Sequence, residues 1–250
     1  MRKIKPEGGL RTREERLVSK NLEKIFLASP DSVEVKLDTF TKYIRRQRLS
    51  RLLSLYEIFK RILPIKGSIV ECGVYRGFSL MAWANMSAVL EPNNLTRRIY
   101  GFDTFGGFPG SSAYDASKNM RIHRGQLSAD TYKELKGLIK AYDKNRFLGH
   151  VPKVQLIKGD VSKTIPKFIS ENKHLVVSLL FLDMDLFTPT KTAIKEFYPR
   201  IPKGGIIAFD ELDNPIWPGE TMALLGSIGI NKLKIQRLEF DPYIGFAVVE

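Results

Sequence analysis

Residues 176–190 read VVSLLFLDMDLFTPT, and this segment decides the fold class. A run of mostly apolar residues leads directly into Asp183 and Asp185, which is typical of a buried strand that ends at the edge of a sheet. Side chains at positions i and i+2 of a strand project to the same side, so the two carboxylates are expected to lie together. The segment therefore predicts a buried strand with an acidic site at its carboxyl end.

Strand-like and helix-like segments alternate along most of the chain. Such alternation is typical of parallel strands joined by crossover helices. Two late segments, at 233–238 and 243–250, are predicted to be strands joined by a turn at Asp241 and Pro242, and such a final pair is often antiparallel. The chain is therefore predicted to be an α/β protein. The alternating segments are 68–74, 78–90, 98–102, 130–142, 153–158, 163–171, 176–182, 190–197 and 205–209.

The N-terminal region differs in character from the rest of the chain. Residues 1–16 are polar and are expected to be disordered. Residues 40–63 carry apolar residues at helical spacing and are predicted to form one amphipathic helix with a basic outer face, which Pro64 and Gly67 end. We predict a basic helical extension at 1–66 and one catalytic domain at 67–250.

One connection within that domain is unusually long. It runs from about residue 106 to 150 and contains glycine, serine, asparagine, basic and aromatic residues. Connections of this length are often lids or binding loops, and a plain surface insertion is equally compatible with the length alone. We expect a lid or substrate loop at 106–150.

The composition excludes several classes of protein. The chain has 250 residues, of which 43% are hydrophobic, and this is enough for one sizeable domain. The single cysteine, Cys72, cannot form an internal disulfide, and the first twenty residues lack the apolar core of a signal peptide. No window approaches the length of a membrane-spanning helix. We expect a soluble, cytoplasmic protein without a membrane partner.

The net charge of +13 raises the alternative of a nucleic-acid or polyanion binder. Residues 1–66 hold 17 Lys and Arg against 8 Asp and Glu, so most of the excess precedes the first predicted core strand. A charge run of this kind more often marks a solvated helical face than a defined binding site. Nucleic acid is therefore not the expected partner, although a non-catalytic polyanion binder stays as the alternative.

Three acidic residues follow or end successive predicted strands. The motif ECGVYRG at 71–77 places Glu71 before a glycine turn, Asp103 ends the strand in YGFDTF, and Asp160 follows the strand in KGDVS. Carboxylates at such strand ends can accept the ribose hydroxyls of a nucleoside, and glycine lets the backbone approach a ligand closely. Each acid alone could cap the following helix. Together they favour a nucleoside site, while the missing middle glycine disfavours a nicotinamide fingerprint.

Two acidic pairs suggest a metal. Asp183 and Asp185 follow one strand, and Asp210 and Glu211 follow the strand in GGIIAFDEL. Neighbouring parallel strands bring both pairs to one edge, where oxygen ligands suit magnesium and four uncompensated acids would be costly. No histidine pair has zinc-ligand spacing, and neither a G-x-S-x-G motif nor a P-loop occurs.

Taken together, the motifs resemble those of the macrocin O-methyltransferase (TylF-like) family, which methylates sugar hydroxyls in antibiotic biosynthesis. The resemblance runs from about residue 68 to 222. The most specific segment is LDMDLFTPTKTAIKEFYPR at 182–200. The others are ECGVYRG at 71, FDTFGGFP at 102, GDVSKTIPKF at 159, GGIIAFDEL at 204 and WPGET at 217.

The resemblance implies a class I methyltransferase (Rossmann-like) fold, a three-layer sandwich around a mostly parallel seven-stranded sheet with an antiparallel edge strand. It also implies S-adenosylmethionine as cofactor and Mg²⁺ held by Asp183, Asp210 and Glu211, with Asp185 as the general base. Glu211 stands where the family commonly has Asp. The cofactor-binding residues expected on this basis are Glu71, Cys72, Gly73, Val74, Tyr75, Gly77, Ser79, Asp103, Thr104, Phe105, Asp160, Val161, Ser162 and Asp183.

The expected reaction is methyl transfer to a hydroxyl of a sugar or sugar-containing small molecule, with a catechol-type acceptor as an alternative. The basic extension and three residues of the long loop, Arg121, His123 and Arg124, suggest an anionic acceptor such as a nucleotide-linked sugar. The sequence leaves the acceptor, the methylated position and the oligomeric state open, and a homo-oligomer is compatible with it.

Overall fold

The computed structural model describes residues 12–116 and 122–250. The chain divides into two compact units, Met1–Leu53 and Ser54–Glu250. Within the predicted disordered segment 1–16, residues 1–11 lie outside the described part, and the remainder enters a helix. The predicted residue Arg121 also lies outside it.

The first unit is helical. Helix α1 (Arg13–Ala28) begins with a capping box, because Thr12 and Glu15 each accept a hydrogen bond from the other's backbone N–H. Helix α2 (Val33–Asp38) and the 3₁₀ helix η2 (Phe40–Lys42) follow, and α3 (Arg46–Ile62) starts in this unit and continues into the second. The prediction of one helix from residue 40 is wrong at its start. The i→i+3 bonds of η2 tighten the backbone there, and the α-helical pattern resumes at Arg46.

The second unit contains one seven-stranded sheet in the order β3-β2-β1-β4-β5-β7-β6. The first five strands are parallel, and β7 pairs antiparallel with both β5 and β6. All six residues of β4 are buried, as expected for a parallel strand covered on both faces. The strands are β1 (Ser68–Cys72), β2 (Ile99–Asp103), β3 (Val154–Lys158), β4 (Val177–Leu182), β5 (Ile206–Phe209), β6 (Gln236–Leu238) and β7 (Asp241–Val248).

The turn between the last two strands lies two residues earlier than predicted. Asp241 is the first residue of β7 and pairs with Leu238, so the turn consists of Glu239 and Phe240. The Asp241 carboxylate is buried, where it accepts hydrogen bonds from the Ser54 hydroxyl at 2.7 Å and from the backbone N–H of Tyr243 at 2.9 Å. These contacts hold Asp241 in the sheet.

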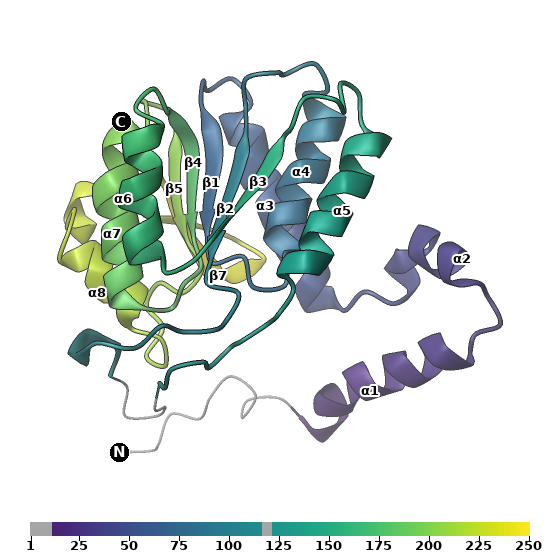
Figure 1. The fold of residues 1–250 in the computed structure, drawn as a ribbon. Coiled ribbons are helices and arrows are strands. Elements are labelled where there is room, and N and C mark those ends of the chain that lie inside the picture. The colour runs from purple at the N-terminus through teal and green to yellow at the C-terminus, as the bar shows by residue number, and fades with distance from the viewer. Residues whose placement is uncertain (1–11, 117–121) are drawn as a thin grey trace. The chain divides into compact units, whose positions relative to one another are not determined.

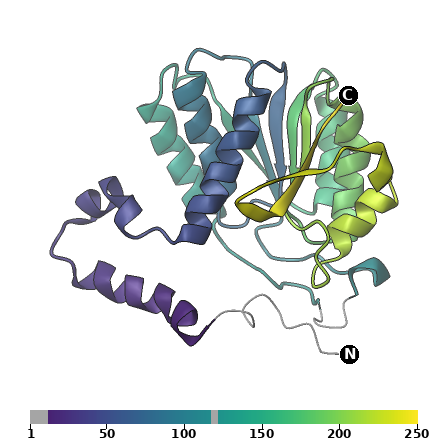
Figure 2. The ribbon, with the colours of Figure 1, turned by 180° about the vertical axis from the view of Figure 1, so that it is seen from behind.

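Helices cover both faces of the sheet, as Figures 1 and 2 show. The second half of α3, α4 and α5 form one layer, and α6, α7 and α8 form the other, which confirms the predicted three-layer fold. No helix in the described ranges is long and apolar enough to cross a membrane. The remaining bounds are α4 (Phe78–Leu90), η3 (Ala113–Asp115), α5 (Tyr132–Asn145), α6 (Val161–Glu171), α7 (Phe187–Phe197), η4 (Tyr198–Arg200), α8 (Gly219–Leu225) and η5 (Ile230–Lys232).

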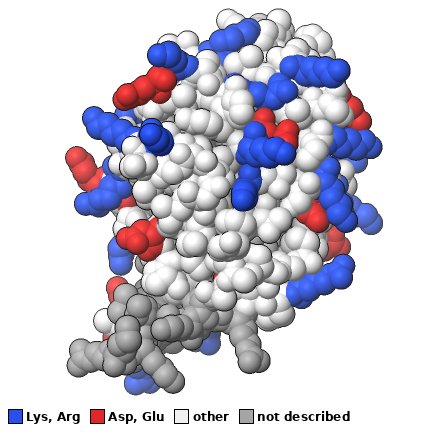
Figure 3. Space-filling view, turned by 90° about the vertical axis from the view of Figure 1, so that its left-hand side faces the viewer, with Lys and Arg blue, Asp and Glu red and all other residues white. Residues whose placement is uncertain are grey.

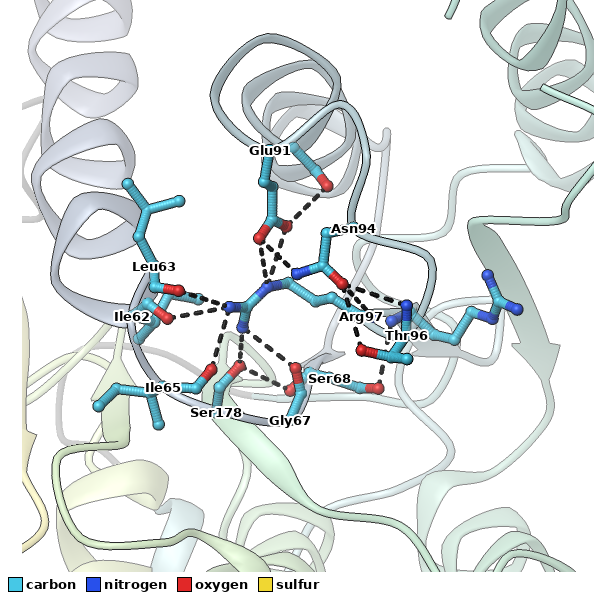
Figure 4. Close-up of polar contacts among 12 residues, drawn as sticks. Ile62, Leu63, Ile65, Gly67, Ser68, Glu91, Asn94, Thr96, Arg97 and Ser178 are labelled. Atoms are coloured by element: carbon cyan, nitrogen blue, oxygen red, sulfur yellow. Dashed lines mark hydrogen bonds and ion pairs between the residues drawn. The ribbon is translucent and has the colours of Figure 1, made fainter. Parts of the chain in front are cut away.

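A buried arginine ties the end of α3 to the sheet. Arg97 is 2% exposed, and its guanidinium forms a 2.9 Å ion pair with Glu91 (Figure 4). The same group donates hydrogen bonds to the Ser178 hydroxyl and to backbone carbonyls at the end of α3 and the start of β1. These bonds satisfy carbonyls that a helix end leaves without partners. The carbonyls belong to Ile62, Leu63, Ile65 and Gly67.

We expect Arg97→Met to destabilise the protein by about 3–5 kcal/mol, because it leaves the Glu91 carboxylate and several carbonyls buried without their donor. Urea unfolding measures the change. The neighbouring Arg98→Met is the control and should lie within about 0.5 kcal/mol of the wild type, since among residues 12–116 and 122–250 no ion pair involves that side chain. A loss for Arg97→Met no larger than that of an exposed ion pair, about 1 kcal/mol, would contradict the prediction.

Candidate functional site

The turn after β1 brings two strand ends into direct contact. Gly73 has φ +96°, and a Cβ atom on it would lie 1.7 Å from the carbonyl oxygen of Asp183, at the end of β4. Gly77, with φ +80°, begins α4, and a Cβ atom there would lie 2.3 Å from Cδ2 of Leu135. Only glycine fits such positions without strain. The strand order reverses between β1 and β4, and crevices at such points bind ligands in open α/β sheets.

The Asp103 carboxylate fastens this turn to the end of β2. Its Oδ2 accepts hydrogen bonds from the backbone N–H groups of Val74 and Tyr75, at 2.8 and 2.7 Å, and its Oδ1 accepts one from Phe105 at 2.6 Å. A carboxylate offers about four lone-pair positions, so these amides use three of them. One position is left for a ligand hydroxyl.

A pocket opens at this edge of the sheet, with about 720 Å³ of empty space, part of it open to solvent. Its size is in the range of small-molecule sites. Of the predicted site residues, it is lined by Gly73, Tyr75, Asp103, Thr104, Asp160, Val161, Asp183 and Asp185. The further lining residues are Phe102, Gly107, Phe108, Pro109, Leu127, Met184, Leu186 and Pro189.

The other predicted residues do not line this pocket. Glu71 is fully buried, and its two carboxylate oxygens accept hydrogen bonds from the Ser79 hydroxyl at 2.9 Å and from Nε1 of Trp83 at 2.7 Å. It therefore ties β1 to α4. Cys72 is also fully buried, and burial raises the pKa of its thiol well above the usual value. The remaining residues outside the pocket lining are Val74, Gly77, Ser79, Phe105, Ser162, Asp210 and Glu211.

Asp160 has two structural roles. It lines the pocket and is also the N-cap of α6, where its side chain accepts a 3.0 Å hydrogen bond from the backbone N–H of Ser162. The helix cap that the sequence left as an alternative is therefore present, and it holds the acid at the edge of the pocket.

The turn between β4 and α7 has an acceptor for every backbone N–H from Asp183 to Phe187. Asp185 has φ +61°, which is uncommon for a residue with a side chain, so the surrounding bonds must hold this conformation. The N–H of Asp183 donates to the Cys72 carbonyl at 2.8 Å, and those of Met184 and Asp185 donate to Oε1 of Glu220 at 2.9 and 3.2 Å. The N–H of Leu186 donates to the Met184 carbonyl at 2.7 Å, and that of Phe187 donates to Oδ1 of Asp115 at 2.6 Å.

Three acids come together beneath this turn. Asp210 is 6% exposed and Glu220 is fully buried. Burial, together with the nearby charge of Asp210, raises the pKa of Asp185 to about 7. Burial also raises the pKa of Glu220 well above its usual value, with Asp185 and Asp210 adding to the shift. Asp185 and Glu220 therefore keep their protons to a higher pH than exposed carboxyl groups do.

The three predicted metal ligands do not form a metal site in this arrangement. Asp183 lines the pocket and Asp210 lies beneath it, whereas the Glu211 carboxylate accepts a hydrogen bond from the side-chain amide of Asn214. Across the described ranges, no group of three His, Cys, Asp or Glu side chains is arranged to hold a metal ion. The side chains of Asp183, Asp210 and Glu211 do not stand as one ligand set in this arrangement, and Mg²⁺ binding stays a prediction.

The start of the long loop forms one wall of the pocket. The backbones of Phe108 and the 125–126 segment exchange two hydrogen bonds, so the loop folds back on itself. The Phe108 ring packs edge-on against Trp217, and Tyr114 stacks on Phe187 at 4.2 Å between ring centroids. These contacts attach the loop to α7 and to the segment before α8.

Asp115 fixes the same loop through hydrogen bonds. It is 2% exposed and accepts hydrogen bonds from the backbone N–H of Phe187 and from both the N–H and the hydroxyl of Ser112. The predicted loop residues His123 and Arg124 are exposed.

Comparison with known families identifies the group to which the chain belongs. The family model described as macrocin-O-methyltransferase (TylF) matches residues 39–223. The chain belongs to this family. The resemblance indicated by the sequence motifs is therefore confirmed, and the match begins ahead of the sheet, near the start of η2.

Two curated relatives of this TylF-family chain come from Streptomyces. The 8-demethyl-8-(2,3-dimethoxy-alpha-L-rhamnosyl)-tetracenomycin-C 4'-O-methyltransferase of Streptomyces olivaceus is 28% identical over 173 residues, which make up 65% of this chain and 60% of that protein. The demethyldecarbamoylnovobiocin O-methyltransferase of Streptomyces niveus is 25% identical over 151 residues, which make up 59% and 53%. The chain therefore matches about half to three fifths of each relative's length.

Solved structures agree with the family and the fold. The calicheamicin methyltransferase CalS11 has a TM-score of 0.91 and 34% identity, over 95% of this chain and 93% of that one. The apo structure of CalS11, a TDP-rhamnose 3'-O-methyltransferase in calicheamicin biosynthesis, has a TM-score of 0.83 and 32% identity, over 95% of each chain. The predicted class I methyltransferase fold is confirmed.

Several residues of this TylF-family site are not among those predicted from the sequence. Glu220 lies in the segment WPGET, which carried part of the resemblance, but no local pattern marks its carboxylate as part of the site. Asp115 lies in the long loop, 72 positions before Phe187, from whose backbone N–H it accepts a hydrogen bond. Phe108 and Pro189 belong to quoted motifs without having been assigned to the site.

We expect Gly73→Ala to weaken the binding of S-adenosylhomocysteine and to destabilise the protein by about 1–3 kcal/mol, because the new methyl group would overlap the Asp183 carbonyl. Calorimetry and thermal unfolding measure the two effects. Gly137→Ala is the matched control. Apart from the adjacent backbone of α5, no atom of the described residues lies within 4 Å of its Cβ position, and alanine should stabilise a helix there by up to about 1 kcal/mol. Unchanged ligand affinity in Gly73→Ala would contradict the prediction.

Proposed function

We propose that this chain is an S-adenosylmethionine-dependent O-methyltransferase that acts on a hydroxyl group of a sugar. The observation that carries the proposal is that Gly73, Asp103, Asp160 and Asp185 line the same pocket at one edge of the sheet. The first three suit a nucleoside, and Asp185 supplies a carboxylate for proton transfer. Membership of the TylF family and the similarity to CalS11 support the same reaction.

The residues of the pocket suit the cofactor. The glycine turn allows close backbone approach, the remaining acceptor position of Asp103 suits one ribose hydroxyl, and Asp160 lies beside it. When bound, S-adenosylmethionine supplies the methyl group and leaves as S-adenosylhomocysteine.

Asp185 is proposed as the base. With the cofactor bound, the methyl group would pass from its sulfur to the acceptor oxygen, and the Asp185 carboxylate would accept the hydroxyl proton. The protein contributes mainly by holding the two reactants in line and by excluding water, since methyl transfer needs no covalent enzyme intermediate. The bonds that fix the turn around Asp185 suit this role, because a base must lie within hydrogen-bond reach of its proton.

We expect Asp185→Asn to lower kcat by about 10²–10⁴-fold, because the amide cannot accept the proton. The affinity for S-adenosylhomocysteine, measured by calorimetry, should stay within about two-fold, a difference of about 0.4 kcal/mol. Asp213→Asn is a matched control, since Asp213 also has a positive φ, +58°, but is exposed. If the Asp185→Asn variant kept the kcat of the wild-type protein, Asp185 would be excluded as the base.

The proposed acceptor is a nucleotide-linked sugar. CalS11 is described as acting on TDP-rhamnose, and the exposed His123 and Arg124 of the loop can attract an anionic acceptor. We also propose the loop within 106–150 as the substrate loop, because its residues Gly107, Phe108, Pro109 and Leu127 line the pocket.

The acceptor is tested with TDP-rhamnose, free rhamnose and catechol, by following S-adenosylhomocysteine release and product mass. We expect methylation of the nucleotide-linked sugar and at least about ten-fold lower kcat/KM for the free sugar, which corresponds to about 1.4 kcal/mol of lost binding to the diphosphate. Faster methylation of catechol than of either sugar would favour the catechol alternative. Methylation of none of them would contradict this choice of acceptors.

Magnesium dependence is a separate proposal. It rests on the acidic residues that follow β4 and β5, namely Asp183, Asp185, Asp210 and Glu211, and no step above depends on the ion. We expect chelated protein to lose activity and to regain it with Mg²⁺, and calorimetry to detect Mg²⁺ binding that Asp183→Asn weakens. Full activity after chelation, without detectable Mg²⁺ binding, would remove the metal and leave methyl transfer intact.

The surface over α6, α7 and α8 does not favour the polyanion-binding alternative. Figure 3 shows blue side chains on this face separated by uncharged surface and by red side chains. The exposed lysines Lys163 and Lys167 of α6 and Lys191 and Lys195 of α7 share these helices with Glu171 and Glu196. Salt-dependent binding of DNA or RNA without any methyl transfer would favour that alternative.

A further inference from the structure

One buried carboxylate joins the two acidic strand ends. Glu220, in the first turn of α8, is fully buried. Its Oε1 accepts hydrogen bonds from the backbone N–H groups of Met184 and Asp185, at 2.9 and 3.2 Å, and its Oε2 accepts one from Glu211 at 3.1 Å. One oxygen therefore holds the turn after β4, and the other holds the turn after β5.

The backbone before Glu220 is shaped for this contact. A Cβ atom on Gly219 would lie 2.3 Å from the carbonyl oxygen of Asp185 and 2.6 Å from the backbone nitrogen of Phe187. Any larger residue would push α8 away from the turn, so the glycine allows the Glu220 carboxylate to reach between both strand ends.

The environment of Glu220 is costly for a carboxylate. The side chain has no access to solvent and lies close to two other acids, Asp185 and Asp210. A buried polar or ionisable group usually stabilises a fold less than an apolar side chain of similar size would. A role in positioning the site, rather than in stabilising the fold, accounts for a carboxylate here.

We propose that Glu220 is a positioning residue, which holds Asp185 and the Asp210–Glu211 end of β5 in one fixed arrangement. It acts through the backbone of both turns and does not itself touch the reactants. The proposal rests on the proposed function insofar as Asp185 is the base. The hydrogen bonds can be tested without any activity.

The experiment uses the full chain with Glu220→Gln, which keeps the shape of the side chain but replaces one acceptor oxygen by a donor. Glu220→Asp keeps the carboxyl group and shortens its reach. Asp241→Asn is the matched control, because Asp241 is also buried and also accepts a backbone N–H, but at the start of β7. The measurements are kcat and KM, the affinity for S-adenosylhomocysteine, and amide hydrogen exchange of Met184, Asp185 and Glu211.

We expect both Glu220 variants to lower kcat by about 10–100-fold, the usual range for residues that orient a site from behind. The KM for S-adenosylmethionine and the affinity for S-adenosylhomocysteine should change less than about two-fold, about 0.4 kcal/mol, because the cofactor half of the pocket is held by Asp103. The amides of Met184, Asp185 and Glu211 should exchange faster, while those of Val74 and Tyr75 stay protected. Asp241→Asn should leave all these values unchanged.

Wild-type kcat in Glu220→Gln or Glu220→Asp, or unaltered exchange of the three amides, would overturn the proposal. If both variants fail to fold, exchange in the wild-type protein decides: unprotected Met184 and Glu211 amides exclude the bridge. If wild-type protein methylates no acceptor but the three amides respond in the variants as expected, the proposed function fails and the bridge stands.

Discussion

The close approach of two backbones, at Gly73 and Asp183, sets the geometry on which the rest of the site depends. The glycine turn after β1 and the acidic turn after β4 meet where the strand order of the sheet reverses. A side chain at position 73 would separate them. Because they meet, the residues suited to a nucleoside and the residues suited to proton transfer share one pocket. The distance between the proposed cofactor site and Asp185 is thus set by the sheet itself.

Carboxylates hold this geometry from several directions. Asp103 fixes the turn after β1, Glu220 fixes the turns after β4 and β5, and Asp115 joins the long loop to the start of α7. All three accept hydrogen bonds from backbone N–H groups that the strands and helices leave over. Acidic side chains in this protein therefore serve as structural acceptors as well as candidates for chemistry, and their role depends on what each one faces.

The sequence predicts the sheet and the pocket edge well, because both follow from local patterns. Apolar runs mark the parallel strands, and the carboxyl ends of such strands share an edge, so Asp103, Asp160, Asp183 and Asp185 do line one pocket. Glu71 has the same pattern but faces Ser79 and Trp83, because a strand alternates its two faces. Local patterns do not resolve which face an acid takes at a strand end.

The long-range contacts could not be predicted in this way. Glu220 accepts hydrogen bonds from the backbone N–H groups of residues 184 and 185, which lie 36 and 35 positions earlier in the chain. Asp115 accepts one from Phe187, 72 positions later. No sequence periodicity connects partners at such separations. The start of α3 was also misplaced, because a 3₁₀ turn and an α-helix share the same apolar spacing over a few residues. Such features depend on the folded chain as a whole.

The hydrogen bonds of Asp103 have a further consequence for how a ligand would be received. A carboxylate that already accepts hydrogen bonds from three backbone N–H groups has a fixed orientation before any ligand arrives. Entry of a ligand then requires little ordering of the protein, and ordering is one of the main costs of binding. This part of the pocket is in this sense preorganised. Its selectivity should depend on the shape of the pocket and on the remaining acceptor position of Asp103.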